Sequence, residues 1–345
     1  MKSNPQFCFK HSSGEDIYLF ALRNAKLEVM ITNYGGIITS MKLRKKNGTV
    51  NDIVLGFDNP EDYVSENYLK HYFYMGSVVG RYANRIKDAA CIIDEKKIKL
   101  TINKGNDQLH GGFSGFDKKV WGPVLFDTEK NELVLQYKSP DGEEGFPGNL
   151  NVKVKFKLHD DEFSYNYEAV TDQTTIVNLT HHGYFNLNNG KGNNYDYHVW
   201  INASHTLEQD LNLVATGNLS PVADTEYDFR RSRKIGNQAN MENGYDKSFV
   251  LDKKGNELSL AAEAICKEYG TGLQVFTTEP VLHFYSGKGI PRIKGKNGIE
   301  YSSYSGFCFE TQKHPNAINV PHFPNTILHP GEIYREETVY KIYEC

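Results

Sequence analysis

The sequence predicts an all-β protein, a large antiparallel β-sandwich with only a few short helices. Apolar and polar residues alternate with period two along residues 152–158, and Phe163, Tyr165, Tyr167 and Ala169 continue the pattern. Such alternation is typical of strands with one face on a core and the other in solvent. Helical periodicity is scarce, and dense strands with few helices between them favour an antiparallel sandwich over an α/β sheet.

Turn signals separate the predicted strands. The polar residues 159–162 form the predicted hairpin between the two alternating runs. A helix is expected over residues 60–69, and a further helical turn near Glu263. Dipeptides that tolerate positive φ mark other hairpin turns, at Asn47-Gly48, Asp141-Gly142 and Asn297-Gly298.

The chain of 345 residues is predicted to form one domain over residues 1–345. It contains no Pro/Ser-rich linker, no low-complexity tract, no long run of one charge and no internal repeat. A chain of this length can bury a substantial core as a single unit.

The charge balance is that of an ordinary globular protein, with 39 basic and 43 acidic residues and a formal net charge of −4. This argues against nucleic acid or an anionic membrane as a partner. The 5 cysteines are scattered without a Cys-x-x-Cys pair, which favours a reducing compartment over a disulfide framework or zinc ribbon. The polar N-terminus lacks the apolar core of a signal peptide, and no apolar run approaches the roughly 18 residues of a membrane span. We therefore expect a cytoplasmic protein.

A lone carboxylate with small neighbours stands out in residues 304–312. If this segment is a strand, Phe307 and Phe309 face one side, where their rings indicate core. Gly306, Cys308 and Glu310 face the other side, which leaves room for a ligand. A partly desolvated Glu310 can act as a general base, although it can equally cap a loop or pair with an arginine.

Histidines elsewhere in the chain could work with this carboxylate. On a strand, His182 would share a face with Thr180 and Tyr184, whereas His181 would face away. His110 precedes two glycines, whose backbone can bend closely around a ligand. Taken singly, each histidine also suits a structural role. Two histidines and a carboxylate can hold a metal ion, but no His-x-His or His-x-x-x-His pair is present to seed such a site.

Polar residues in other segments suit sugar hydroxyls. In residues 80–86, alternation puts Arg81 and Arg85 on one face and Asn84 on the other. Arginine and asparagine donate well to hydroxyl oxygens, although arginine beside strands is also a common ion-pair partner. Asp246 follows a turn signal and equally suits an Asx turn.

These residues lie within motifs that resemble those of the galactose mutarotases (aldose 1-epimerases), and the resemblance covers nearly the whole chain. The matching motifs follow the family's order. They are GRYANRI (80–86), LHGGFSGFDKKVW (109–121), PDGEEGFPGNL (140–150), LTHHGYFNL (179–187), PVADTEYDFR (221–230), GYD (244–246), TTEPVLHFYSG (277–287) and GFCFETQKHPNAINVPHFPNTILHPGEIY (306–334).

The resemblance implies a β-sandwich of the galactose mutarotase type and interconversion of the α- and β-anomers of free sugars such as galactose and glucose. It implies that Glu310 is the catalytic base, that His182 is the acid, and that His110 is the other active-site histidine. It also implies sugar-binding roles for Asn84, Arg85 and Asp246.

The chain departs from its relatives in two segments. Many relatives have Asn-His-Ser where this chain has His181-His182-Gly183, which keeps the acid but changes its neighbours. Position 279 is often glutamine in animal-type relatives and is Glu279 here. We expect this carboxylate to lie near the sugar pocket and to affect hydroxyl preference more than the reaction itself.

The chemistry suits an acid–base pair. Anomer exchange opens a hemiacetal, rotates the aldehyde end about C1–C2 and closes the ring again. A carboxylate can take the proton of the C1 hydroxyl while an imidazolium protonates the ring oxygen, each transfer contributing about 10²–10⁴-fold. We expect the nearby carboxylate to raise the histidine pKa and keep it charged near neutrality.

This reaction requires no metal, nucleotide or redox cofactor, and the chain shows no P-loop and no dinucleotide-binding motif. The expected partner is a small aldose, and the expected assembly is a monomer or weak dimer. Other readings stay open. They are a hexose-6-phosphate 1-epimerase with Arg81 and Arg85 as its basic pair, a catalytically silent sugar-binding protein, and a metal-dependent oxygenase or isomerase.

Overall fold

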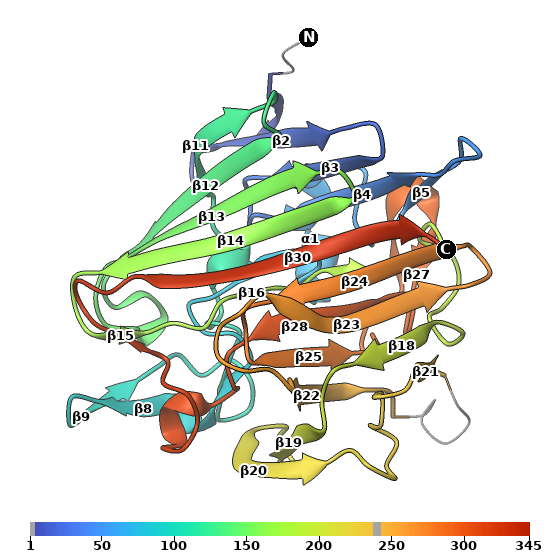
Figure 1. Ribbon diagram of the computed structural model, residues 1–345. Coiled ribbons are helices and arrows are strands. Elements are labelled where there is room, and N and C mark those ends of the chain that lie inside the picture. The colour runs from blue at the N-terminus through green and yellow to red at the C-terminus, as the bar shows by residue number, and fades with distance from the viewer. Residues whose placement is uncertain (1–3, 237–242) are drawn as a thin grey trace.

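The computed structural model describes residues 4–236 and 243–345, and strands dominate it (Figure 1). A nine-stranded antiparallel sheet forms one layer, and six-stranded and five-stranded antiparallel sheets pack against it. Phe185 of the six-stranded sheet meets Tyr340 of the nine-stranded sheet edge-on, with 5.1 Å between ring centroids. The predicted all-β antiparallel sandwich is confirmed.

The large sheets contain most of the chain. The nine-stranded sheet runs in the order β11 (Gly122–Asp127), β12 (Glu132–Ser139), β13 (Leu150–His159), β14 (Glu162–Thr171), β30 (Tyr334–Glu344), β24 (Thr271–Thr277), β23 (Ser259–Cys266), β18 (His198–Ile201) and β21 (Arg233–Lys234). The six-stranded sheet runs β17 (Tyr184–Phe185), β28 (Phe307–Gln312), β25 (Val281–Tyr285), β22 (Asp246–Val250), β19 (His205–Gln209) and β20 (Ala215–Pro221). The five-stranded sheet runs β1 (Gln6–Lys10), β2 (Asp16–Arg23), β3 (Leu27–Thr32), β4 (Ile38–Arg44) and β5 (Val50–Asp52).

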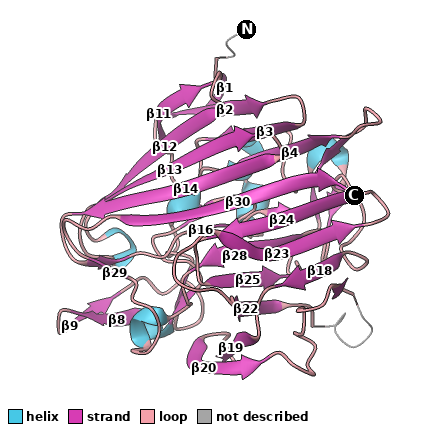
Figure 2. Cartoon of the chain, in the orientation of Figure 1, coloured by secondary structure: helices cyan, strands magenta, loops and turns pink. Residues whose placement is uncertain are grey.

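Short strand pairs and helical turns complete the described chain (Figure 2). The pairs are β6 (Val78–Val79) with β16 (Thr180–His181), β7 (Arg85–Ile86) with β10 (Gln108–Leu109), β8 (Ala90–Ile93) with β9 (Lys96–Lys99), β15 (Thr175–Ile176) with β29 (Ile327–Leu328), and β26 (Ile293–Lys294) with β27 (Glu300–Tyr301). The α-helix is α1 (Glu66–Lys70), and 3₁₀ turns span Pro60–Val64, Lys87–Ala89, Phe116–Lys118, Glu143–Gly145, Lys296–Gly298 and Ala317–Asn319. None of the helices in the described part of the chain could cross a membrane.

The central hairpin follows directly from the alternating sequence. In β13 and β14 the apolar positions are buried and the intervening polar positions are not, and His159 pairs with Glu162 at the turn. The predicted turn at Asn47-Gly48 also joins paired strands, β4 and β5. Cysteines in the described chain are all unpaired, as expected from their spacing.

The predicted helices are only partly correct. Residues 60–69 form a 3₁₀ turn and then α1, divided at Ser65, whose hydroxyl caps α1 by accepting from the Tyr68 amide. The helical turn predicted near Glu263 is wrong, because Glu263 lies within β23 and pairs with Gln274 of β24. Pairing with a neighbouring strand therefore determines the secondary structure of a segment whose local pattern is ambiguous.

Core packing determines which side chains of the six-stranded sheet remain for chemistry. Phe307 and Phe309 of β28 are fully buried in the main hydrophobic cluster, together with Phe284 of β25. Their strand neighbours Cys308 and Glu310 therefore point to the opposite face, as predicted. The segment around His182 is less regular than predicted, because β16 and β17 are separate short strands.

His181 is a buried base, fully excluded from solvent beside the ring of Tyr165, with centroids 5.5 Å apart. Burial, with a smaller contribution from the nearby His182, lowers the pKa of His181 to about 3. In the unfolded chain the pKa of a histidine is about 6.5. Between these values the unfolded state binds more protons, so the free energy of unfolding decreases as the pH falls below 6.5.

We predict that His181→Phe weakens this pH dependence while keeping a ring against Tyr165. The wild type loses about 2 kcal/mol through this residue between pH 7 and pH 5, at about 1.4 kcal/mol per proton per pH unit, and the variant does not. Urea unfolding at both pH values measures the difference, with the exposed His205→Phe as control. Equal pH dependence in wild type and His181→Phe would contradict the assignment.

Candidate active site

The centre of the candidate site is a buried carboxylate facing an imidazole. Glu310 of β28 is 1% exposed, and its Oε1 lies 3.6 Å from Nε2 of His182. This separation exceeds a hydrogen bond, and Oε2 of Glu310 has no hydrogen-bond partner among the described residues. A buried, unpartnered carboxylate oxygen is costly, which suits a group that waits for a ligand hydroxyl.

The chain around His182 is held on both sides. Its amide donates to the Ser77 carbonyl at 2.8 Å, and its carbonyl accepts from the Gly76 amide at 2.9 Å. Its ring lies between the rings of Tyr74 and Tyr184, stacked at centroid distances of 5.7 Å and 5.0 Å. The imidazole is therefore fixed in position before any ligand arrives.

Cys308 contacts the other ring nitrogen of His182. Its Sγ lies 3.5 Å from Nδ1 of His182, on the same face of β28 as Glu310. Burial raises the pKa of the Cys308 thiol well above its usual value, so the sulfur keeps its hydrogen and can donate it to Nδ1. When the thiol donates in this way, the hydrogen of the neutral imidazole lies on Nε2, which faces Glu310.

The expectation that a nearby carboxylate raises the pKa of His182 and keeps the ring charged near neutrality is wrong. Burial lowers the pKa of His182 more than the negative charge of Glu310 raises it, and His283 adds a repulsive charge. His182 is 5% exposed, so desolvation is nearly complete. The sequence suggests a carboxylate near His182, but it does not show how deeply His182 is buried.

His110 is positioned by an exchange of backbone and side-chain hydrogen bonds with Asn84. The Asn84 amide donates to Nδ1 of His110 at 3.2 Å, and the His110 amide donates to the Asn84 carbonyl at 3.0 Å. The next residue, Gly111, has φ +83°, and a Cβ there would lie 2.0 Å from the Gly80 carbonyl oxygen. The glycines after His110 thus allow a close approach to the Gly80 backbone.

The three catalytic candidates come together from distant parts of the chain. One side-chain atom from each of His110, His182 and Glu310 lies within 4.8 Å of the other two. Two imidazoles and a carboxylate at this spacing resemble a metal-binding triad, although no adjacent histidine motif seeds it. The sequence pattern therefore could not decide whether a metal site forms.

The hydrogen bond to His110 decides against a metal ion there. Because Nδ1 accepts the Asn84 amide hydrogen, the neutral ring carries its own hydrogen on Nε2. Burial lowers the pKa of His110 well below 6.5, with His182 and Arg85 lowering it further, so the neutral form predominates. Nε2 is then a hydrogen-bond donor without a lone pair for a metal, which suits a sugar oxygen.

The arginines of residues 80–86 have different surroundings. Arg81 is 1% exposed, and its guanidinium donates to the hydroxyl and carbonyl of Ser139 and to the carbonyls of Pro140 and Pro147. It is a structural residue, so the proposed Arg81–Arg85 basic pair is not available. Arg85 pairs across β7 and β10 with Leu109, the residue before His110, and its charge contributes to the lowered pKa of His110.

Asp246 and a histidine that the sequence reasoning missed form a pair beside Glu310. Asp246 Oδ1 lies 2.9 Å from Nε2 of His283, and His283 is the cross-strand neighbour of Glu310. Alternation along β25 separates His283 from Phe284, but only the pairing of β25 with β28 shows that His283 and Glu310 share a face. Tyr74, which stacks on His182, was likewise without a sequence signal.

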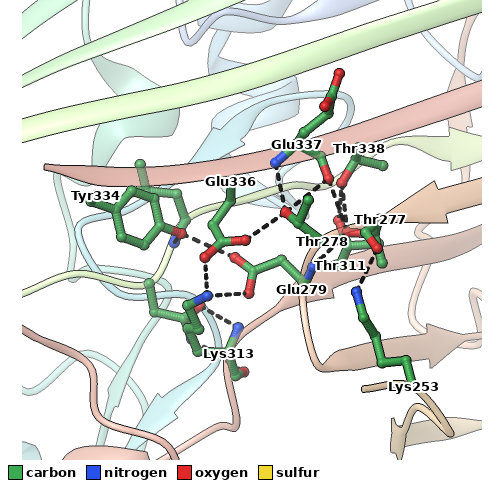
Figure 3. A network of polar contacts seen from close by, with 12 residues as sticks. Lys253, Thr277, Thr278, Glu279, Thr311, Lys313, Tyr334, Glu336, Glu337 and Thr338 are labelled. Carbon is green, nitrogen blue, oxygen red and sulfur yellow. Dashed lines mark hydrogen bonds and ion pairs between the residues drawn. The ribbon is translucent and has the colours of Figure 1, made fainter. Parts of the chain in front are cut away.

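Glu279, which the sequence predicts to lie near the sugar, is buried in a polar network of its own (Figure 3). It accepts a hydrogen bond from the Tyr334 hydroxyl at 3.1 Å and pairs with Lys313 at 2.9 Å. Lys313 also pairs with Glu336, whose Oε2 accepts from the Thr278 hydroxyl at 2.6 Å. Burial raises the pKa of Glu279 to about 7 although Lys313 opposes this shift. The described polar contacts of the Glu279 side chain are thus with Lys313 and Tyr334, not with the catalytic candidates.

The fold and site define a β-sandwich protein with a buried acid–base pair. The sequence pattern of the family described as aldose 1-epimerase matches residues 18–341. The galactose mutarotase of Sus scrofa is 42% identical over 331 residues, covering 95% of this chain and 94% of that protein. The aldose 1-epimerase of Escherichia coli K12 is 32% identical over 338 residues, covering 95% of this chain and 96% of that protein.

Solved structures agree. The crystal structure of the GalM/aldose epimerase homologue from C. elegans superposes with a TM-score of 0.87 at 28% identity, covering 94% of this chain and 98% of that chain. The galactose 1-epimerase of Lactobacillus acidophilus gives 0.84 at 28% identity, with 99% of each chain covered. This chain belongs to the aldose 1-epimerase family.

We predict that Glu279→Gln leaves KM and kcat for galactose within about twofold of wild type but lowers stability. Removing one charge of the buried Lys313 pair costs about 1–3 kcal/mol, which thermal unfolding measures as a lower Tm. A raised KM at unchanged Tm would instead place Glu279 at the sugar.

Proposed function

We propose that this protein is an aldose 1-epimerase that interconverts the α- and β-anomers of free hexoses such as galactose and glucose. The observation that carries the proposal is the buried Glu310 carboxylate facing Nε2 of His182 across 3.6 Å, with one carboxylate oxygen unpartnered among the described residues. A sugar hydroxyl can contact Glu310 while the neighbouring ring oxygen of the same sugar contacts His182. The family membership of the chain supports the same reaction.

The reaction begins with ring opening. Glu310 takes the proton of the C1 hydroxyl, the C1–O1 bond becomes a carbonyl, and the bond from C1 to the ring oxygen breaks. The fraction of His182 that is protonated, which the charge of Glu310 increases against the effect of burial, gives its Nε2 hydrogen to the departing ring oxygen. The aldehyde then turns about C1–C2, and closure reverses both proton transfers, so Glu310 and His182 return to their starting states.

The remaining residues orient the sugar. His110, held neutral with its hydrogen on Nε2, donates to a sugar oxygen, and Arg85 supplies a positive charge beside it. Asn84 positions His110 through its backbone, in addition to the sugar-binding role that the family motif implies. Asp246, whose side chain is 38% exposed, accepts from a sugar hydroxyl. Positioning by such groups converts binding energy into rate.

We predict that Glu310→Gln removes nearly all turnover, at least about 10²-fold in kcat, because an amide keeps the shape but accepts no proton. Polarimetry on freshly dissolved α-galactose measures the acceleration over the spontaneous rate. Calorimetry with the same variant is expected to show retained galactose binding. Substantial turnover by Glu310→Gln would move the base to another residue.

We predict that His182→Asn lowers kcat by about 10²-fold or more while KM changes by less than about threefold. The reason is that the acid acts only on the way to the transition state. The same polarimetric assay over a range of galactose concentrations separates the two parameters. An unchanged kcat with a raised KM would make His182 a binding residue.

The alternatives are distinguished by the same assay. A hexose-6-phosphate 1-epimerase needs a cationic phosphate site, but the guanidinium of Arg81 is committed to Ser139, Pro140 and Pro147. Faster turnover of glucose 6-phosphate than of galactose would favour that alternative. A silent sugar-binding protein would bind galactose without accelerating mutarotation, and loss of activity in chelator would indicate a metal enzyme.

A further inference from the structure

His283 lies at the centre of the six-stranded sheet, between the strands of Asp246 and Glu310. Its register neighbours are Ser248 on β22 and Glu310 on β28. The three side chains therefore share one face of the sheet, the face opposite the aromatic core. The imidazole is buried, with 5% of the side chain exposed.

Both ring nitrogens of His283 are occupied by protein groups. Nε2 lies 2.9 Å from Oδ1 of Asp246, and Nδ1 lies 2.9 Å from the hydroxyl of Ser248. Neither nitrogen remains for a sugar, so His283 is not a catalytic residue. Asp246, in contrast, has 38% of its side chain exposed, and its Oδ2 can accept a further hydrogen bond.

The charges around His283 favour an ion pair with Asp246. Burial alone would lower the pKa of His283, but the hydrogen bond and charge of Asp246, with help from Glu310, raise it. Burial alone would raise the pKa of Asp246, but His283, Arg85 and His182 bring it below its usual value. The positive charge of Arg85 opposes protonation of His283, and His110 and His182 also interact electrostatically with His283.

We propose that His283 is a positioning residue that fixes the Asp246 carboxylate for a sugar hydroxyl on the side of the ring away from C1. This proposal rests on the proposed epimerase function, in which Glu310 works at C1. Asp246 and Glu310 lie on strands separated by β25, so their backbones are about 10 Å apart across the sheet. A pyranose lying between them would meet Glu310 with its anomeric end and Asp246 with its far hydroxyls.

The position of the buried His283 ring matters for sugar binding because the Asp246 carboxylate would rotate without a hydrogen bond to hold it. Ser248 holds the ring through Nδ1, and the ring then holds Oδ1 of Asp246 through Nε2. Only Oδ2 remains to bind a ligand, in a direction set by the sheet. Loss of the hydrogen bond between His283 and Asp246 leaves Glu310 and His182 intact but weakens binding of the sugar.

The test compares His283→Leu with His283→Gln by polarimetry on galactose. We expect His283→Leu, which cannot donate to Asp246, to raise KM by about tenfold with kcat within about threefold of wild type. His283→Gln, whose amide can donate to Asp246, is expected to recover most of the loss. The exposed His205→Leu on the same sheet is the control and should change neither parameter.

Binding measured without turnover gives an independent result. In the Glu310→Gln background, calorimetric titration with galactose should show about tenfold weaker binding when His283→Leu is added. If His283 acts through Asp246, Asp246→Asn and the double variant Asp246→Asn/His283→Leu should bind equally weakly. Additive losses would give His283 a separate role and overturn the proposal.

The failures of the two proposals are distinguishable. No acceleration of mutarotation by the wild type would overturn the epimerase function itself. An active wild type with an unchanged KM in His283→Leu would overturn only the positioning role. If His283→Leu does not fold, an unchanged KM in Asp246→Asn would overturn the positioning role in its place.

Discussion

The antiparallel pairing of β25 with β28 serves the core and the candidate site at once. Its register sets His283 opposite Glu310 on one face of the sheet and Phe284 opposite Phe309 on the other. A slip of one residue would turn the carboxylate into the aromatic core, so burial of the phenylalanines enforces the direction of Glu310. The hydrophobic contacts that hold the sandwich together therefore also direct the Glu310 carboxylate toward His182.

Polar groups hold the end of this strand pair where the chain leaves β28. Lys313 follows β28 and Glu279 precedes β25, and their ion pair joins the two strands to Glu336 of β30 (Figure 3). Asn178 accepts from the Lys313 amide at 2.8 Å and donates to the Ala83 carbonyl at 3.3 Å. The segments that carry Glu310, Asn84 and Arg85 are thus tied together, which supports a preorganised site.

Local alternation was sufficient to predict the strands and the strand face on which Glu310 lies, because the period of two is a property of the segment itself. It was insufficient for features that depend on distant partners. The strand around Glu263, the role of His283 and the structural bonds of Arg81 all follow from pairings between separate segments. The lowered pKa of His182 likewise follows from burial, which outweighs the charge of Glu310.

We propose that Glu310 and His182 act on opposite ends of one bond system in the sugar, the C1 hydroxyl and the ring oxygen. A crystal structure of the Glu310→Gln variant with galactose tests it most directly. We expect the C1 hydroxyl within about 3.2 Å of the side chain at position 310 and the ring oxygen within about 3.2 Å of Nε2 of His182. A sugar bound with its ring oxygen away from His182, or with its C1 hydroxyl turned from position 310, would contradict it.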